Sequence, residues 1–150
     1  MPFKIRRIVT THDANGKAIV GIDTLIDSHP GVKDKNVQNA GLWATAEMPA
    51  DNSGNRDPVA TKLELSPGPN GTIFRMLELP PGAPPLMHKT DTIDYVLMME
   101  GECDMLLDDG KEVHMNQGDV MIQRATWHGW ANRSNKTCRI AFVLIDAKKL

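Results

Sequence analysis

Cysteine is scarce in this chain of 150 residues, which has only Cys103 and Cys138, each inside an apolar run. Two cysteines cannot form a disulfide framework, so a small secreted domain held together by cross-links is excluded. We expect two reduced thiols in the core, with one disulfide between them as the less favoured alternative.

Long hydrophobic runs and an excess of one charge are also missing. No apolar stretch is long enough to cross a bilayer, and no secretory leader is recognisable at the N-terminus. The 17 Lys and Arg residues are scattered and are balanced by 19 Asp and Glu, for a net charge of −2. This pattern argues against nucleic-acid binding. We expect a cytoplasmic protein with no membrane and no nucleic-acid partner.

Helical periodicity is absent as well, because no segment of useful length carries an apolar stripe at helical spacing. Short β-favouring runs follow one another instead, separated by turns rich in Gly, Asn and Pro, which is typical of an all-β sandwich or barrel. The expected strands cover residues 3–9, 18–22, 41–47, 61–66, 72–79, 93–100, 102–108, 112–115, 120–123, 128–131 and 138–146.

The length fits one structural domain, in which residues 61–150 form the barrel and residues 1–60 supply N-terminal strands and a long arm. The pair Asn15-Gly16 suits positive φ and predicts a hairpin between the first two strands. Residues 23–60 carry little periodic signal, and such a long irregular segment is either functional or wraps a neighbour.

The strand over residues 93–100 is apolar on both faces. One face should line the barrel, and the other should pack against a second sheet or a second subunit. We therefore expect a homodimer in which the N-terminal arm adds a strand to its partner or covers a sheet edge.

Two stretches carry the chemistry. GAPPLMHKTDTIDYVLMMEG (82–101) holds His88 and Asp94, and GDVMIQRATWHGWAN (118–132) holds His128. Neutral imidazoles and a carboxylate are the usual ligands of a divalent first-row metal. If the three side chains converge, they form a small-molecule site inside a β-barrel. The alternative is that the histidines are metal-free acids or bases, and that Asp94 is a buried carboxylate satisfied by hydrogen bonds.

Three further residues are candidates for substrate binding. Thr90 shares the parity of His88 and Asp94, although it could be a simple β-branched strand residue. Trp130 shares the face of His128 and would form either a pocket wall or plain core. Arg75 could bind a substrate carboxylate, or it could lie at the surface or at a subunit interface.

These stretches resemble the two motifs of the cupin family. Gly82, His88, Thr90, Asp94 and Gly101 fall on the five marked positions of the first motif with matching spacing. The second motif matches less completely: three marked positions are kept, two differ, and the segment is one residue shorter. The kept residues are Gly118, His128 and Asn132, and the departures are Arg124 and Thr126. The resemblance covers residues 72–146.

The resemblance implies a double-stranded β-helix, or jelly-roll barrel, with additional N-terminal strands. Carried over residue by residue, it also implies a metal held by His88, His128 and Asp94, the last in place of a glutamate. Thr90 replaces the family's other histidine and is a poor ligand for zinc or iron. Two histidines and one carboxylate with open positions suit divalent Fe, Mn, Zn or Ni. No organic cofactor is expected.

The expected function is that of a small-molecule enzyme whose metal polarises an oxygen of a carbonyl- or carboxylate-bearing substrate. Lyase, decarboxylase, dehydratase and isomerase chemistry all fit, and a non-haem iron dioxygenase is an alternative. A metal-free cupin that binds a ligand or uses His and Asp as acid and base is a second alternative. A non-enzymatic storage or structural role is the least favoured.

Overall fold

The computed structural model describes residues 2–60 and 63–150. Its regular elements are β-strands and one short 3-10 turn, and no α-helix occurs in the described ranges. The strands are β1 (Lys4–His12), β2 (Ala18–Asp27), β3 (His29–Pro30), β4 (Gln38–Thr45), β5 (Thr72–Leu79), β6 (Thr92–Glu100), β7 (Glu102–Leu106), β8 (Glu112–Asn116), β9 (Val120–Arg124), β10 (Gly129–Ala131) and β11 (Cys138–Asp146). The all-β jelly-roll expected from the sequence is confirmed. No helix in the described part of the chain is long and apolar enough to span a membrane.

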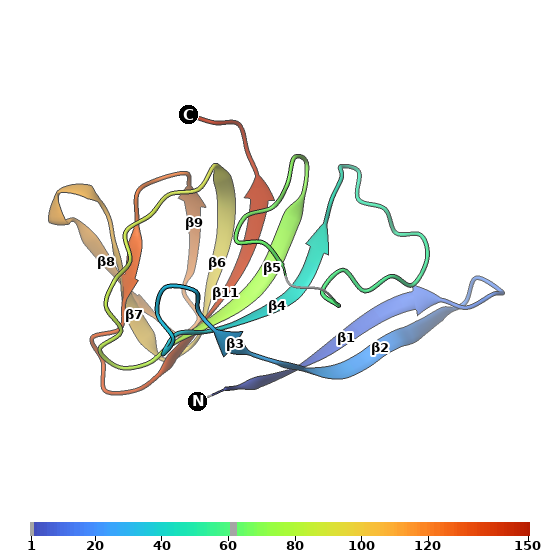
Figure 1. The fold of residues 1–150 in the computed structure, drawn as a ribbon, viewed down its shortest axis with the longest axis horizontal. Helices are drawn as coiled ribbons and strands as arrows, with labels where there is room; N and C mark the ends of the chain where they lie inside the picture. Colours follow the sequence, from blue (N-terminus) through green and yellow to red (C-terminus); the bar gives the residue numbers. More distant parts are fainter. Residues whose placement is uncertain (1, 61–62) are drawn as a thin grey trace.

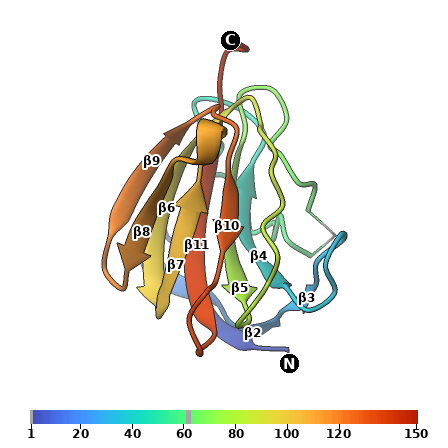
Figure 2. The same cartoon turned by 90° about the vertical axis from the view of Figure 1, so that its left-hand side faces the viewer.

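Two antiparallel sheets enclose the core (Figures 1 and 2). The larger has the order β3-β4-β5-β11-β6-β9, and the smaller has the order β10-β7-β8. Side chains from both sheets meet in one apolar cluster, which includes Val96, Met98, Met105, Trp130 and Phe142. The sheets therefore form a filled barrel in which one strand face of each points inward.

Strand alternation explains which residues face the core. In β6, Thr92, Asp94, Val96 and Met98 are buried, whereas the residues between them are more exposed. This is the period-two pattern of a half-buried strand. The strand ends at Glu100. In the next residue, Gly101, φ is 74° and a Cβ atom would lie 3.0 Å from the carbonyl oxygen of Thr137. Glycine at this position lets β6 turn directly into β7.

The expected N-terminal hairpin is present as β1 and β2, which pair from Lys4 and Asp27 to His12 and Ala18. Its loop is closed by the carboxylate of Asp13, which accepts hydrogen bonds from the backbone N–H groups of Asn15 and Lys17. Of the expected pair, only Gly16 has a positive φ.

Several expected boundaries are wrong. β2 continues to Asp27 and β4 begins at Gln38, so residues 23–40 are more regular than the sequence predicted. The strand expected over residues 61–66 is absent at residues 63–66, while residues 61–62 lie outside the described part. The carbonyls of Glu64 and Leu65 accept hydrogen bonds from the Arg75 side chain. These two backbone carbonyls are therefore paired with a side chain and not with the backbone of a neighbouring strand.

The N-terminal hairpin packs on the outer face of the larger sheet. Phe3 lies there with Ala40, Leu42, Met76 and Ala141 in a second apolar cluster, against which Ile5 and Ile26 also pack. The other end of the hairpin projects away from the barrel (Figure 1). The base of the N-terminal arm therefore covers part of the chain's own sheet.

Cys103 and Cys138 are both free and buried. The expectation of two reduced core thiols is confirmed in the structure. Both side chains belong to the cluster between the sheets.

Candidate functional site

A backbone bridge places His88 beside His128. The N–H of each residue donates to the carbonyl oxygen of the other, and both N···O distances are 2.9 Å. Directly opposed residues of an antiparallel pair project to the same side. The two imidazole ring centroids are accordingly 4.2 Å apart, with 54° between the ring planes. Pairing of two segments distant in the sequence thus creates a two-histidine site.

Small and polar residues hold these two segments together. Gly129 follows His128, and a Cβ atom there would lie 2.9 Å from Met87 Sδ and 3.3 Å from the carbonyl oxygen of Leu86. Asn132 is 1% exposed, and its side-chain amide donates to the carbonyls of Leu79 and Lys136 at 2.8 and 2.7 Å. The asparagine of the second motif is therefore an anchor for the adjoining loops.

Backbone carbonyls fix the tautomer of both rings. His88 Nδ1 lies 2.9 Å from the oxygen of Leu86, and His128 Nδ1 lies 2.9 Å from the oxygen of Thr126. Because a carbonyl oxygen only accepts, the neutral form of each ring carries its proton on Nδ1, and Nε2 then has the lone pair. Metal-binding histidines are commonly oriented in this way.

His128 is only 3% exposed. Burial lowers its pKa to about 4, more strongly than the hydrogen bond to Thr126 raises it. The ring is therefore neutral at physiological pH. Neither Nε2 of the pair has a hydrogen-bond partner within residues 2–60 and 63–150.

Asp94 lies at the centre of a second polar group. It is 5% exposed and accepts a hydrogen bond of 2.7 Å from the Thr92 hydroxyl. That hydroxyl has one hydrogen, so Thr90, 2.7 Å away, donates to Thr92. Burial raises the pKa of the Asp94 carboxyl, while the Thr92 hydrogen bond and the charges of Arg75 and His88 act in the opposite direction.

The structure brings two of the three expected metal ligands together. No group of three or more His, Cys, Asp and Glu side chains could hold a metal ion in the part of the chain that is described. Asp94 is close enough for the charge of His88 to affect its pKa. Its role as a third ligand stays a prediction.

Trp130 and Arg75, two of the expected substrate-binding residues, have different environments. Trp130 is 6% exposed and belongs to the core, with its ring edge-on to Phe142 at 5.5 Å and to His128 at 6.3 Å between centroids. Arg75 is half-buried on β5 and lines a cavity. Thr90 reaches Asp94 through Thr92, as described above.

Sequence reasoning missed Gln123. It lies directly opposite Asp94 in the β6–β9 ladder and is 4% exposed. Neither its amide oxygen nor its amide nitrogen has a hydrogen-bond partner among the described residues. Buried polar groups are nearly always paired, so this amide indicates a place for a polar ligand or water beside Asp94. The sequence shows only that Gln123 shares a strand face with Met121. It does not show that Gln123 lies opposite Asp94, because that depends on how β9 pairs with β6.

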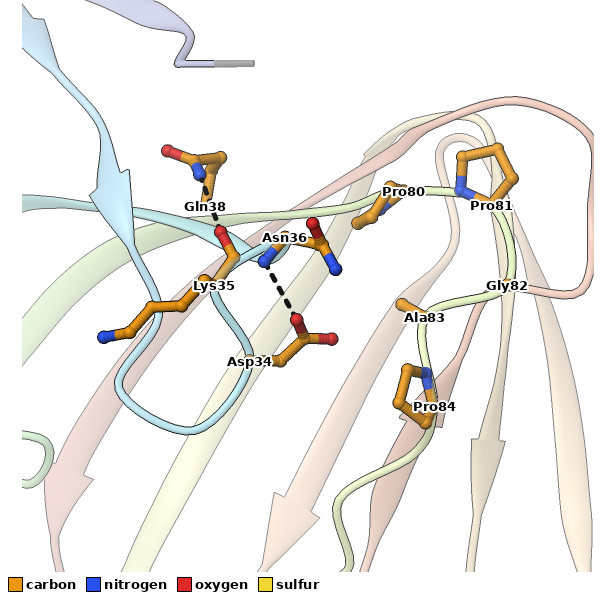
Figure 3. A pocket seen from close by; sticks show the side chains of 9 residues that line it. All are labelled: Asp34, Lys35, Asn36, Gln38, Pro80, Pro81, Gly82, Ala83 and Pro84. Carbon is orange, nitrogen blue, oxygen red and sulfur yellow. Dashed lines mark hydrogen bonds between the residues drawn. The ribbon is translucent and has the colours of Figure 1, made fainter.

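Two cavities lie away from the histidine pair. The larger, of about 450 Å³, is formed by the segment from Asp34 to Gln38 and the turn from Pro80 to Pro84 (Figure 3). Its side chains partly satisfy one another, as where Gln38 donates to the carbonyl of Lys35. The smaller, of about 180 Å³, contains Arg75. Neither is lined by His88 or His128.

Solved structures similar to this chain are cupin barrels. A cupin 2 conserved barrel domain protein from Rhodopseudomonas palustris has a TM-score of 0.57 at 16% identity, covering 95% of this chain and 83% of that one. The Cnp3 cupin domain of Schizosaccharomyces pombe has a TM-score of 0.56 at 13% identity, covering 96% of this chain and 89% of that one. At these identities the similarity concerns the fold alone.

Sequence comparison reaches further. The family model described as Cupin domain matches residues 75–145. Phomopsin biosynthesis cluster protein C' of Diaporthe leptostromiformis is 35% identical over 153 residues, covering 96% of this chain and 79% of that protein. The cupin-domain-containing oxidoreductase fogC of Aspergillus ruber is 31% identical, covering 95% of this chain and 73% of that protein. On this coverage and identity, the chain belongs to the cupin family.

Proposed function

We propose that this protein is a small-molecule enzyme in which His88 and His128 hold a divalent metal inside the cupin barrel. The observation that carries the proposal is the pair of adjacent imidazoles, each with Nδ1 bound to a backbone carbonyl and with Nε2 free of hydrogen-bond partners in the described part of the chain. The names of the relatives, which include a biosynthesis cluster protein and a cupin-domain oxidoreductase, support a role in small-molecule metabolism.

The donor set fits a metal with open coordination positions. Two neutral imidazoles are good ligands for Fe, Mn, Zn or Ni. We propose Asp94 as the carboxylate that would supply a third ligand. The unpartnered amide of Gln123 beside Asp94 adds a polar group that can bind water or substrate. When bound, the metal would polarise an oxygen of the substrate.

The remaining residues would exchange protons with the substrate and exclude water from the site. Burial raises the pKa of Asp94, which favours a carboxyl that can exchange a proton with the substrate, and the hydroxyls of Thr92 and Thr90 form a hydrogen-bonded chain to it. Trp130 and Phe142 pack edge-on against each other in the apolar cluster between the sheets, which excludes water there. Such an arrangement supports lyase, decarboxylase, dehydratase or isomerase chemistry on an oxygenated substrate. The oxidoreductase names of relatives support the dioxygenase alternative.

A metal-free acid–base enzyme or ligand-binding cupin is the second candidate. It is favoured by the lack of a three-ligand group in the described residues and by the buried, threonine-linked carboxyl of Asp94. In that case His88, His128 and Asp94 would exchange protons with the ligand directly.

Metal content distinguishes the two candidates. Wild-type protein purified without chelator, or reconstituted with Fe, Mn, Zn, Ni or Co, is expected to retain one metal per chain by elemental analysis. The double variant His88→Ala with His128→Ala should retain none. The matched control changes His12 and His114, which are exposed, to alanine and should bind metal like the wild type. Wild type that stays metal-free with every metal, or a His88/His128 variant that keeps it, would contradict the metal proposal.

We also propose that the protein is a homodimer formed through the outer face of the larger sheet. Its central rows are apolar, since Phe74, Val143, Tyr95 and Ile122 lie in register across four strands. The chain's own hairpin covers the half with Met76 and Ala141, and the other half is open. The exposed side chains there are Phe74, Tyr95, Leu97, Met99, Val120 and Ile122.

The area of this open half supports a second copy as the occupant. The six side chains expose roughly 500 Å², taking about 150–250 Å² for a large side chain. The hairpin beside them exposes Ile8, Ile19, Val20 and Leu25 as well. Together these surfaces approach the roughly 800 Å² per partner of a standard interface. The edge of the face carries the ion pairs of Arg139 with Glu78 and Glu100, as the rim of an interface commonly does.

Leu97→Glu should convert the dimer to a monomer, because it places a charge in the apolar row beside that of Tyr95, where Leu97 lies between Ala141 and Val120. Light scattering coupled to size-exclusion chromatography at micromolar concentration measures the change. Val113→Glu is the matched control, since Val113 is 45% exposed but lies on β8 in the smaller sheet. A monomeric wild type, or a dimeric Leu97→Glu variant, would show that this face is not the interface.

A further inference from the structure

We propose that Arg75 binds the carboxylate of a small organic ligand in the cavity of about 180 Å³ between β4, β5 and the segment Leu63–Leu65. The proposal deepens the function proposed above, on which it rests, by assigning the acidic end of the substrate to a particular side chain. Within the described residues Arg75 has unused donors and forms no ion pair, and it shares the cavity with other polar atoms.

The guanidinium of Arg75 has donors to spare. Its Nη2 donates to the carbonyl oxygens of Glu64 and Leu65, at 2.8 and 2.7 Å. A guanidinium has five N–H donors, so Nε–H and both hydrogens of Nη1 are left. Nε is buried without a partner among the described residues. A carboxylate is the acceptor that matches such a group of donors in both charge and shape.

The charge of Arg75 is also incompletely balanced. None of the ion pairs formed within residues 2–60 and 63–150 includes Arg75. Burial lowers its pKa, and the charge of Asp94 opposes this effect from a distance. Glu64 lines the cavity, but its side chain is exposed and Arg75 contacts only its backbone oxygen. An incoming carboxylate would therefore neutralise a partly desolvated cation.

The rest of the cavity suits an acid with an apolar body. Leu63, Leu65 and Val32 supply apolar walls, and His29 and Asn39 add polar groups. Asn39 Oδ1 is buried without a hydrogen-bond partner in the described chain, so it can accept from a ligand hydroxyl. The volume is below the roughly 300–1,000 Å³ of a complete ligand pocket. The cavity therefore fits a small acid or the acidic end of a larger compound.

The position of Arg75 connects this cavity with the candidate site. Arg75 pairs with Phe142 on β11, and Phe142 pairs in turn with Val96 on β6; Phe142 and Val96 belong to the apolar cluster between the sheets. The pKa of Asp94 responds to the charges of both Arg75 and His88. Asp94 is two residues from Val96 on β6, so Arg75 and Asp94 share the inward face of the larger sheet, and a carboxylate bound at Arg75 would lie on the same face as Asp94.

Benzoate and its neutral isostere benzamide test the proposal by titration monitored with ¹H–¹⁵N NMR. Benzoate is expected to shift the amide signals of the cavity glycines Gly31 and Gly41, with a Kd of about 1 mM. Benzamide should bind at least about tenfold more weakly, and Arg75→Gln should weaken benzoate by the same factor. Arg124→Gln, which removes an exposed arginine of β9, should bind benzoate like the wild type.

Separate outcomes distinguish this proposal from the metal proposal. Arg75→Gln should keep its metal, and the His88/His128 double alanine variant should keep its benzoate site. Equal binding of benzoate and benzamide would overturn the carboxylate assignment, as would full benzoate affinity in Arg75→Gln. So would a wild type that shows no shifts up to about 10 mM benzoate. A change confined to the stability of Arg75→Gln would instead assign Arg75 to holding the segment Leu63–Leu65.

Discussion

Replacing Asp57 by asparagine is expected to destabilise the fold by about 2–3 kcal/mol, because it leaves a buried guanidinium without its counter-charge. Arg7 is 8% exposed, and it donates to the Asp57 carboxylate and to the carbonyl oxygen of Leu42. Asp57 itself is 27% exposed, so the loss falls below that of a fully buried pair. Urea unfolding of both proteins at the same protomer concentration measures the difference.

The same contact predicts how stability depends on pH. Hydrogen bonding to Arg7 is the main reason that the pKa of Asp57 is lowered from its ordinary value of 3.8. A carboxyl whose pKa is lower in the folded state stabilises the fold above its unfolded pKa and loses this contribution as the pH falls. The difference between wild type and Asp57→Asn should therefore be constant near neutral pH and shrink as the pH falls from about 5 toward 3.

An exposed pair provides the control for the Asp57 variant. Arg6 and Asp23 make a two-hydrogen-bond contact on the other face of the same hairpin, but both are solvent-exposed. Asp23→Asn should lower the free energy of unfolding far less than Asp57→Asn does, because a solvent-exposed ion pair contributes little to stability. Equal losses in the two variants would show that the burial of Arg7 does not strengthen its contact with Asp57.

The barrel could be predicted from the sequence because its signals are local. Short alternating runs and the Gly, Asn and Pro turns between them define strands such as β5 and β11. The sequence predicted these two strands at residues 72–79 and 138–146, and the structure has them at the same residues. β4 was placed three residues too late, since Gln38 is polar and yet buried, where it accepts a hydrogen bond from Ser28. Tertiary hydrogen bonding of this kind leaves no periodic trace in the sequence.

In the candidate site, too, the residues within local motifs could be predicted, whereas those that depend on contacts between distant segments could not. His88 and His128 stand out by spacing within their motifs, and the structure pairs them directly. Gln123 and Thr92 could not be selected, because their importance depends on register across β6 and β9 and on a hydroxyl contact with Asp94. The N-terminal arm was expected to add a strand to a partner or to cover a sheet edge. How much of it packs on its own sheet depends on contacts between Phe3 and residues far along the chain.

Trp130→Ala is expected to lower the free energy of unfolding by about 3–5 kcal/mol, the largest effect of a single substitution considered for this protein. The indole is 6% exposed and packs edge-on against Phe142 between the two sheets. Its removal would leave a cavity that the strands on either side cannot close, because β10 is held in the β7 ladder. For a domain of this size the loss corresponds to a fall in melting temperature of roughly 10 °C.

Trp130→Phe separates the packing role of this residue from a role as a pocket wall. Phenylalanine keeps an aromatic edge against Phe142 and fills much of the volume, so the loss should be about 1–2 kcal/mol. Because Trp130 also lies edge-on to His128, the alanine variant should bind metal more weakly, whereas the phenylalanine variant should retain it. Calorimetric unfolding and metal titration of the two variants measure both effects. If Trp130→Ala kept its stability to within about 1 kcal/mol, the indole would be a pocket wall, as the sequence allowed, and the core would have to be held by the aliphatic and methionine side chains around it.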